Sequence, residues 1–225
     1  MKISATTLSI LKNFTLINKG ILLTKGNKLQ TRTASVYAEA MVEETFPAEV
    51  GIYELGNLLS VIALFNDAEY DFAEDALRIC EATGQAEVLY GYAGGGMVSL
   101  PLPKQKMALP EEVIKFTLTE EQWVRMQKAT SVFNKPEVKI TSDGTVVRMA
   151  TANHKAEGGN TFSMILDAQP NGLICNMIFN KDHMNLLKGS YDGTITPTYA
   201  VFSNKSGLDL TYYIVSEPTT STFNA

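Results

Sequence analysis

The chain has 225 residues and a mass of 24.6 kDa, with 45% hydrophobic residues, 19% charged residues and a formal net charge of -5. This composition is typical of a folded globular protein and excludes an intrinsically disordered chain. The net negative charge argues against a protein that binds nucleic acid over its whole surface, because such proteins usually carry a basic excess. That argument weakens if acidic and basic residues are segregated onto different faces.

The sequence shows no motif for a metal or a cofactor. Cys80 and Cys175 are far apart and lack Cys-x-x-Cys or Cys/His spacing, which indicates free thiols and not a zinc site or a disulfide framework. Near the N-terminus there is a single Lys2 and no long apolar run, and nowhere are there 18 consecutive apolar residues. We therefore expect a cytosolic protein that needs no cofactor.

The first half of the chain is predicted to combine helices with groups of antiparallel strands. Before Gly20 a helical pattern puts Ile10, Leu11, Phe14 and Ile17 in one apolar stripe, and Lys12 and Lys19 on the opposite side. Gly20 is expected just after the helix C-terminus, with Lys19 in the last turn. A hairpin over 21–33, strands over 36–42 and 49–55, a short helix over 58–64, and strands over 69–74, 76–82 and 87–93 follow.

The second half repeats this order of elements after a break. Three consecutive glycines, 94–96, and the prolines Pro101, Pro103 and Pro110 predict a boundary between a domain over 1–107 and a domain over 108–225. We expect a strand over 113–118, a helix over 119–133, strands over 137–141, 145–152, 161–166 and 173–179, a short helix over 181–188, and strands over 193–196, 199–203 and 208–215. Helices at matching places in both halves predict an α+β fold of two similar domains.

Basic residues gather on the predicted helices. Thr119 and Gln122 fit a capping box at the start of the second half's main helix, whose apolar stripe is Trp123, Met126, Thr130 and Phe133. Arg125 and Lys128 then project from the opposite side of that helix, and Lys181 and Lys188 share a face of the last one. The acidic residues, in contrast, lie on predicted strands or their connecting loops: Glu43, Glu44, Glu49, Glu54, Glu69, Asp71, Glu74, Glu81 and Glu87.

Several short runs in the first third of the chain resemble one known family. They are Leu11-Lys12-Asn13-Phe14, Ile17-Asn18, Gly20-Ile21, Thr31-Arg32, Tyr37-Ala38-Glu39-Ala40, Ile52-Tyr53 and Asn66-Asp67. Over residues 8–67 these runs are similar to the sliding clamp, the DNA polymerase processivity factor, of T-even-type bacteriophages. Beyond residue 68 the resemblance is carried by length, by the order of elements and by Asn160-Thr161-Phe162.

The resemblance implies a DNA-clamp fold in which β-α-β-β-β units repeat, helices line a central hole and antiparallel sheets lie outside. Three subunits would close into a ring around duplex DNA and hold the replicative polymerase for processive synthesis. The DNA-facing residues would be Lys12, Lys19, Arg125, Lys128, Lys181 and Lys188. Sequence-independent attraction to phosphate suits a ring that slides.

The resemblance also implies contacts with further proteins. Edge strands of neighbouring subunits would pair through Glu87, Val88, Leu89 and Tyr90 in one domain and Thr161, Phe162 and Met164 in the other. A pocket for short partner peptides near the domain junction would use Leu100, Leu102, Met107 and Leu109, although an interdomain core contact explains these residues equally well. An ATP-dependent clamp loader and late-transcription factors are further implied partners, in the cytoplasm of the infected bacterial host.

The residues give little support to an enzyme. His154 and His183 are the only histidines, and neither stands next to a serine or cysteine in a nucleophile motif. Residues 92–96 lack the Gly-Lys-Ser/Thr of a phosphate-binding loop, and Asp143-Gly144 and Asp192-Gly193 indicate hairpin turns. The alternative is an oligomeric structural or virion protein with no nucleic-acid role, since helix lysines that simply contact water would give the same composition.

Overall fold

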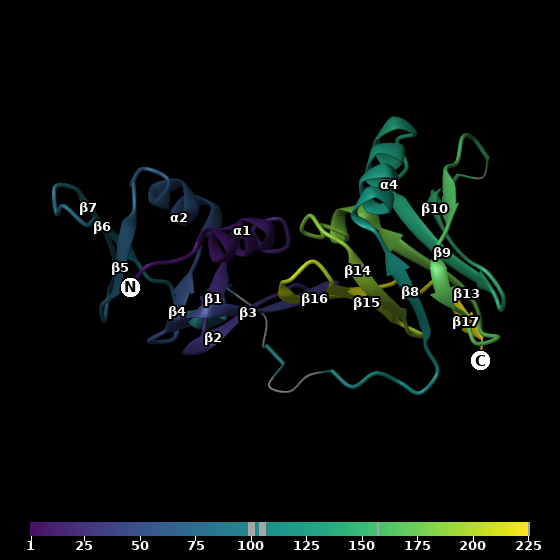
Figure 1. Ribbon diagram of the computed structural model, residues 1–225, viewed down its shortest axis with the longest axis horizontal. Coiled ribbons are helices and arrows are strands. Elements are labelled where there is room, and N and C mark those ends of the chain that lie inside the picture. Colours follow the sequence, from purple (N-terminus) through teal and green to yellow (C-terminus); the bar gives the residue numbers. More distant parts are fainter. Residues whose placement is uncertain (99–101, 104–106, 157, 225) are drawn as a thin grey trace. The chain divides into compact units, whose positions relative to one another are not determined.

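A computed structural model describes residues 1–98, 102–103, 107–156 and 158–224 (Figure 1). The chain divides into two compact units, Met1–Lys104 and Gln105–Ala225. The domain boundary between residues 107 and 108 remains a prediction. Leu100, one of the predicted pocket residues, lies outside the described residues. In the described part of the chain, no helix is both long and apolar enough to cross a membrane.

The first unit consists of short antiparallel sheets and two main helices that lie on the same side of β1 to β4 (Figure 1). β1 pairs with β4, β2 pairs with β3, and β6 lies between β5 and β7. The elements are α1 (Ala5–Phe14), β1 (Ile21–Leu23), β2 (Gly26–Arg32), β3 (Val36–Phe46), β4 (Val50–Ile52), α2 (Leu55–Ile62), β5 (Ala68–Phe72), β6 (Ala76–Glu81), β7 (Glu87–Gly91) and α3 (Gly95–Val98).

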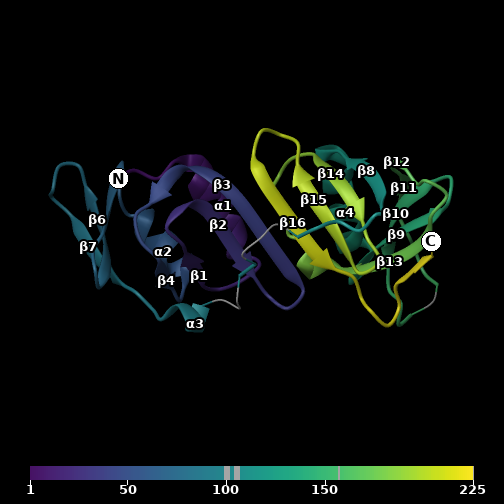
Figure 2. The same ribbon diagram turned by 90° about the horizontal axis from the view of Figure 1, so that it is seen from below.

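The second unit has two antiparallel sheets. The strand orders are β11-β10-β9-β13-β17 and β12-β8-β14-β15-β16, and Figure 2 shows β14, β15 and β16 side by side. The elements are β8 (Ile114–Leu118), α4 (Glu120–Val132), β9 (Glu137–Asp143), β10 (Val147–Ala152), β11 (Ser163–Ile165), β12 (Asp167–Gln169), β13 (Ile174–Asn180), the 3-10 turn η1 (Lys181–His183), β14 (Tyr191–Ile195), β15 (Tyr199–Asn204), β16 (Asp209–Val215) and β17 (Thr222–Asn224).

The predicted strand over 161–166 forms only as β11, Ser163–Ile165, because the chain then changes from one sheet to the other. β11 pairs with β10, and β12, which follows directly, pairs with β8. Leu166, between them, is buried and donates its backbone N–H to the carbonyl of Val147. The chain therefore crosses from one sheet to the other at Leu166, which leaves β11 only three residues long.

Two predictions about pairing and helices are wrong. The hairpin over 21–33 does not form, because Ile21 to Leu23 pair with Val50 to Ile52 while β2 pairs with the long strand β3. The helix over 181–188 is only the 3-10 turn η1. The backbone N–H of Leu187 donates to the Tyr212 hydroxyl and its carbonyl accepts from the Tyr191 hydroxyl, so the two tyrosines satisfy both backbone groups of Leu187 without a helix.

Tyr191 and Tyr212 are fully buried in the second unit, and their rings pack edge-on at 6.1 Å between centroids. Burial raises the pKa of Tyr191 to about 12, and burial followed by the charge of Tyr191 raises the pKa of Tyr212 in the same direction. The unfolded chain ionises its tyrosines near pH 10. As pH rises, the unfolded chain therefore loses these tyrosine protons at a lower pH than the folded chain does. The stability contributed by the protonated tyrosines is complete below about pH 10 and is lost as pH rises through 12.

We expect the free energy of unfolding to fall by about 1.4 kcal/mol per pH unit for Tyr191 alone between pH 10 and 12. Thermal unfolding followed from pH 8 to pH 12 measures this slope. Tyr191→Phe should lower stability at pH 8 by about 1 kcal/mol, since a buried hydrogen bond is lost, and should give a shallower alkaline slope. Parallel curves for the two proteins would contradict a role for Tyr191.

Candidate nucleic-acid interface

α1 begins earlier than its apolar pattern predicts, because a polar cap fixes its start. The Ser4 hydroxyl accepts from the backbone N–H of Thr7, and Glu44 on β3 accepts from the backbone of Ser4 and from the Thr7 hydroxyl. Burial alone would raise the pKa of Glu44, but the hydrogen bonds from Thr7 and Ser4 lower it overall. The N-terminus of α1 is thus tied to β3 by an ionised carboxylate.

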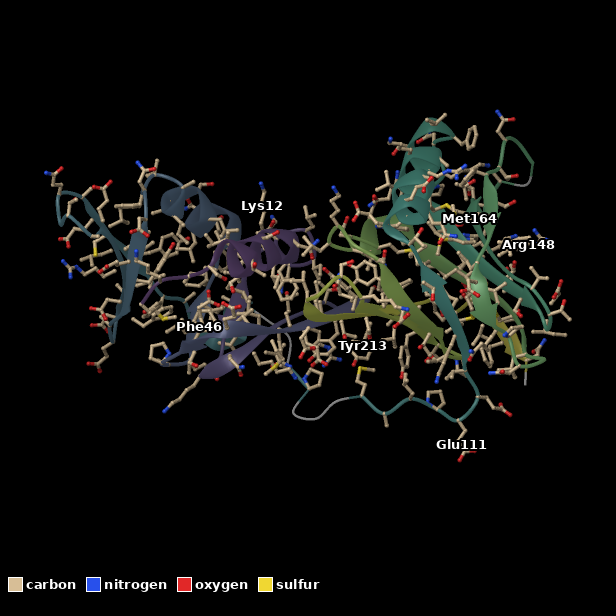
Figure 3. All side chains as sticks on the ribbon, in the orientation of Figure 1. Lys12, Phe46, Glu111, Arg148, Met164 and Tyr213 are labelled. Atoms are coloured by element: carbon tan, nitrogen blue, oxygen red, sulfur yellow. The ribbon has the colours of Figure 1, made fainter. Side chains whose placement is uncertain are left out.

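The predicted stripe of α1 is confirmed at Ile10, Leu11 and Phe14, which are all buried. Lys12 lies on the opposite face and is exposed, and Figure 3 shows it pointing away from the strands beneath the helix. In the part of the chain that the structure describes, Lys12 forms no ion pair. This side chain is available to an anion.

The helix ends at Phe14 with Thr15 as its C-cap, so the prediction that Gly20 follows its last residue is wrong. Gly20 instead allows close packing, because a Cβ atom there would lie 2.8 Å from the carbonyl oxygen of Ile52. Lys19 consequently lies in the loop after the helix, where its side chain is exposed and its carbonyl accepts from Leu55 at the start of α2.

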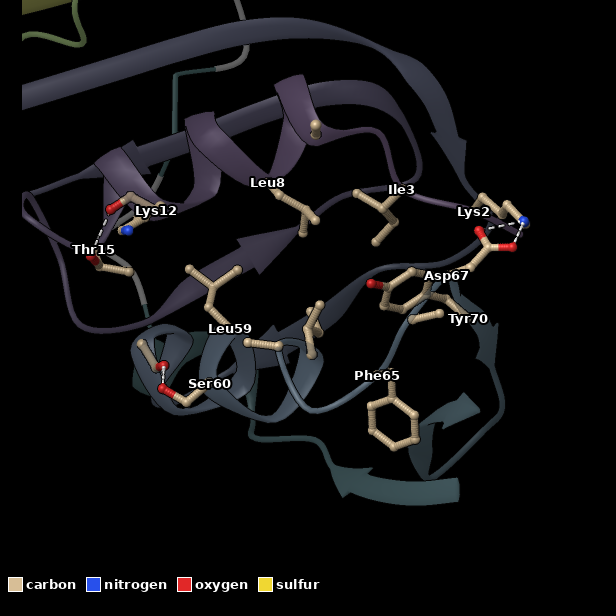
Figure 4. Close-up of a pocket in the computed structure, with 15 residues that line it drawn as sticks. Lys2, Ile3, Leu8, Lys12, Thr15, Leu59, Ser60, Phe65, Asp67 and Tyr70 are labelled. Carbon is tan, nitrogen blue, oxygen red and sulfur yellow. Dashed lines mark hydrogen bonds and ion pairs between the residues drawn. The ribbon is translucent and has the colours of Figure 1, made fainter. Parts of the chain in front are cut away.

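A groove of about 720 Å³ runs between α1 and α2 beside Lys12 (Figure 4). Leu8 from α1 and Leu59 from α2 form its apolar walls. Lys2 also lines the groove, where it forms an ion pair with Asp67. The exposed side of the first unit's helix pair therefore carries cations around an apolar depression.

α4 forms as predicted, with the capping box of Thr119 and Gln122 fully made. Trp123, Met126 and Thr130 are buried, whereas Phe133 is the C-cap and only half-buried. The helix thus presents one face to the second unit's core and the other to solvent.

The solvent face of α4 carries both predicted cations. Arg125 lies 3.8 Å from Glu121 in an exposed pair, and its guanidinium carbon is 5.9 Å from the centre of the Phe162 ring. A cation–π contact of this kind holds the Arg125 guanidinium against the loop that precedes β11 and leaves the positive charge of the guanidinium in place. Lys128 is exposed and makes no ion pair within the described ranges. Nothing in the sequence indicated the Arg125–Phe162 contact, because the two residues are 37 positions apart.

The last two predicted cations flank α4 and do not share a helix face. Lys188 lies 3.3 Å from Glu120 in the first turn of α4. Lys181 is half-buried, and its backbone N–H donates to Pro136, a few residues beyond the helix C-terminus. The prediction that Lys181 and Lys188 share a helix face is therefore wrong. Lys188 lies beside the first turn of α4, and the backbone of Lys181 lies beside the residues that follow its last turn.

The acidic residues of the first unit lie on its sheets. Glu69, Asp71 and Glu87 are exposed on the three-stranded sheet, where Glu87 pairs with Arg78 at 2.8 Å. Glu44 lies on β3 and also binds the start of α1. In the first unit, Lys12 and Lys19 lie on or next to α1 and most carboxylates lie on strands, although Lys25, on a turn, is a further cation without an ion pair among the residues described.

The predicted interface residues lie at two strand edges. β7 pairs only with β6, and β11 pairs only with β10, among the described residues. Leu89 on β7 is 67% exposed and Ile165 on β11 is 57% exposed. Figure 3 labels Met164 on β11 and Arg148 on the neighbouring β10. Unpaired edges with exposed apolar side chains are surfaces that another chain can cover.

The residues predicted to form a partner pocket are only partly described. Leu102 and Met107 are half-buried and Leu109 is 47% exposed. The pocket near the junction remains a prediction.

Several known proteins are similar to this chain in sequence. The family model described as DNA polymerase processivity factor matches residues 2–72. Three similar proteins are named sliding clamp: that of Vibrio phage KVP40, 26% identical over 96% of this chain and 99% of its own length; that of Escherichia phage RB69, 27% identical over 85% of each; and that of Enterobacteria phage T4, 28% identical over 74% and 80%.

Solved structures show the same fold at low sequence identity. The Proliferating Cellular Nuclear Antigen of Entamoeba histolytica superposes with a TM-score of 0.67 at 12% identity, over 93% of this chain and 94% of that one. The DNA polymerase III β sliding clamp of Bartonella birtlesii gives 0.69 at 13%, over 96% of this chain and 64% of that one. The predicted α+β DNA-clamp fold is confirmed, with the difference that η1 replaces the second unit's last helix.

Sliding clamps are processivity factors and not catalysts, so the relatives confirm the prediction that the protein is not an enzyme. They also favour this function over the alternative of a structural protein with no nucleic-acid role. In the family match at its start, in relatives along nearly its whole length and in its fold, the chain is similar to the sliding clamps of T-even-type bacteriophages, the DNA polymerase processivity factors.

Proposed function

We propose that this processivity factor encircles duplex DNA as a ring of three subunits and holds the replicative polymerase on its template. The observation that carries the proposal is the segregation of charge: Lys12, Arg125 and Lys128 are exposed on helix faces, and the carboxylates of the first unit lie mainly on strands. Lys19, Lys181 and Lys188 extend the cationic surface in the same two units. Such a surface attracts phosphates without reading sequence, which allows a ring to slide.

The two unpaired strand edges support assembly into a ring. β7 in the first unit and β11 in the second are different surfaces, so a contact between β7 of one subunit and β11 of the next is head-to-tail. Head-to-tail contacts close into rings when the rotation between subunits permits. On this proposal Glu87, Val88, Leu89 and Tyr90 face Thr161, Phe162 and Met164 of the neighbouring subunit.

Similarity to the sliding clamps supports the remaining partners. A polymerase and late-transcription factors would dock through short peptides near Leu102, Met107 and Leu109, and an ATP-dependent loader would open and close the ring. No cofactor is assigned to the clamp itself. On this proposal the protein acts in the cytoplasm of the infected bacterial cell.

Native mass measured by light scattering over a concentration series tests the ring. We expect a mass near three times 24.6 kDa that falls towards the monomer on dilution. After loading onto DNA, the protein should remain on a nicked circle and be lost from the same DNA once it is linearised, because only an encircling ring depends on the topology of the DNA. A monomer or dimer at every concentration, or equal retention on both DNAs, would contradict the proposal.

A further inference from the structure

The first unit has a second depression, of about 450 Å³, that the proposed function does not use. It lies where the chain leaves β7 and runs past β4, and the two segments are joined by a bridge between Gly51 and Ala93 (Figure 2). The backbone N–H of Ala93 donates to the carbonyl of Gly51 at 2.8 Å. A Cβ atom at Gly51 would lie 2.3 Å from the carbonyl oxygen of Ala93, so only glycine permits this closure of the floor.

The floor of this pocket is apolar. Leu22 from β1, Val50 from β4 and Phe72 from β5 line it, and Phe72 is held edge-on against buried Phe46 at 5.8 Å. Three elements that are distant in sequence therefore supply one apolar surface. Its volume suits one or two apolar side chains of a ligand.

The rim of the pocket is acidic. Glu49 and Glu74 line it, both are exposed, and neither forms an ion pair with any residue that the structure describes. Asp71 lies close enough to Tyr92, another lining residue, for its charge to add to burial in raising the pKa of that phenol. Uncompensated carboxylates around an apolar floor favour a cationic ligand and repel nucleic acid.

Tyr92 adds a possible polar contact. Its hydroxyl is buried and has no hydrogen-bond partner within the described ranges. Since burial and Asp71 raise the pKa of Tyr92, the hydroxyl stays protonated at neutral pH and keeps a proton to donate. A main-chain carbonyl of an inserted segment would satisfy this donor.

We propose that this pocket, defined by Leu22, Glu49, Val50, Phe72, Glu74 and Tyr92, binds a segment of a partner protein in which one or two large apolar side chains are flanked by lysine or arginine. The apolar side chains occupy the floor and the flanking cations lie beside Glu49 and Glu74. The pocket shares no lining residue with the cationic helix faces or with the predicted peptide pocket. A partner can therefore dock here whether or not the protein encircles DNA.

Fluorescence anisotropy with the labelled peptide Lys-Leu-Phe-Lys, acetylated and amidated at its ends, tests the proposal on the full chain. The double variant Glu49→Gln, Glu74→Gln should bind about tenfold more weakly than the unchanged protein, because two exposed charge contacts are lost. A matched control, Glu43→Gln with Glu69→Gln, removes the same charge from exposed strand positions outside the pocket and should change affinity less than about twofold.

A third variant, Ala73→Trp, fills the pocket from an exposed turn position and should weaken binding at least as much as the loss of both rim carboxylates. Unchanged thermal unfolding midpoints show that each variant is folded. No binding of the peptide to the unchanged protein, equal losses in the two double variants, or full affinity in Ala73→Trp would each overturn the proposal. Binding of Glu-Leu-Phe-Glu with the same affinity would also overturn it.

Discussion

Changing Lys12, Arg125 and Lys128 together to glutamine should abolish processive DNA synthesis by the cognate polymerase at physiological salt. The three side chains are exposed and are half of the six predicted DNA-facing cations, so a ring would lose nine such charges and much of its long-range attraction to phosphate. We expect the length of product per binding event to fall by roughly tenfold or more, and the loss to be smaller at low salt, where the remaining cations are less screened.

The control for this experiment keeps the same change in net charge. Lys25, Lys115 and Lys155 are exposed on turns or strands and form no ion pair in the described part of the chain. Their triple change to glutamine should leave processivity within about twofold. Primer extension on a single-stranded circle, with excess trap DNA, measures both variants. Full processivity without Lys12, Arg125 and Lys128 would show that these residues do not face DNA.

Placing a charge at the exposed edge of β7 should break the ring. Leu89→Asp puts a carboxylate where the proposed joint buries an apolar side chain, and burial of an unpaired charge costs several kcal/mol. Each ring has three such joints, so the native mass should fall to that of the monomer at concentrations where the unchanged protein is assembled. Because Leu89 is 67% exposed in the single chain, the stability of the subunit itself should hardly change.

Cysteine cross-linking determines which residues meet at that joint. Leu89 and Ile165 lie on the solvent side of their sheets, since each pairs across its strand with an exposed arginine, Arg78 and Arg148 respectively. Leu89→Cys combined with Ile165→Cys should form disulfide-linked trimers under mild oxidation. Leu89→Cys with Ile174→Cys is the control, because Ile174 is exposed on β13 away from the β11 edge. If the protein is a trimer but Leu89→Cys and Ile165→Cys do not cross-link, the ring proposal stands and the proposed pairing of β7 with β11 is wrong.

Features encoded by neighbouring residues could be predicted from the sequence. The cap, the buried stripe and the two cations of α4 all lie within fifteen positions of one another, and all were predicted. The stripe of α1 was predicted for the same reason. Its start was not predicted, although the capping bond from Thr7 to Ser4 is local. The bond that ties this cap to Glu44 on β3, 40 residues from Ser4, could not be read from the sequence.

Features that depend on distant partners could not be predicted. The amphipathic spacing over 181–188 fits a helix. In the structure, however, the hydroxyls of Tyr191 and Tyr212 form the hydrogen bonds of the Leu187 backbone, and no α-helix forms there. Gly20 has the position of a helix cap, but the neighbouring carbonyl of Ile52 explains it. For the candidate site, residue type and charge predicted Lys12, Arg125 and Lys128. The contact of Arg125 with the Phe162 ring could not be predicted, because it joins residues that are distant in sequence.

The crossing of the chain at Leu166 sets an upper limit on how firmly neighbouring subunits can be held. β11 ends after three residues because the next residues belong to another sheet, so it can offer a partner strand only a few main-chain hydrogen bonds. Each contributes about 1 kcal/mol net. In the proposed ring, a joint of this length would separate while both subunits stay folded, and a loader would have to supply correspondingly little energy to admit DNA.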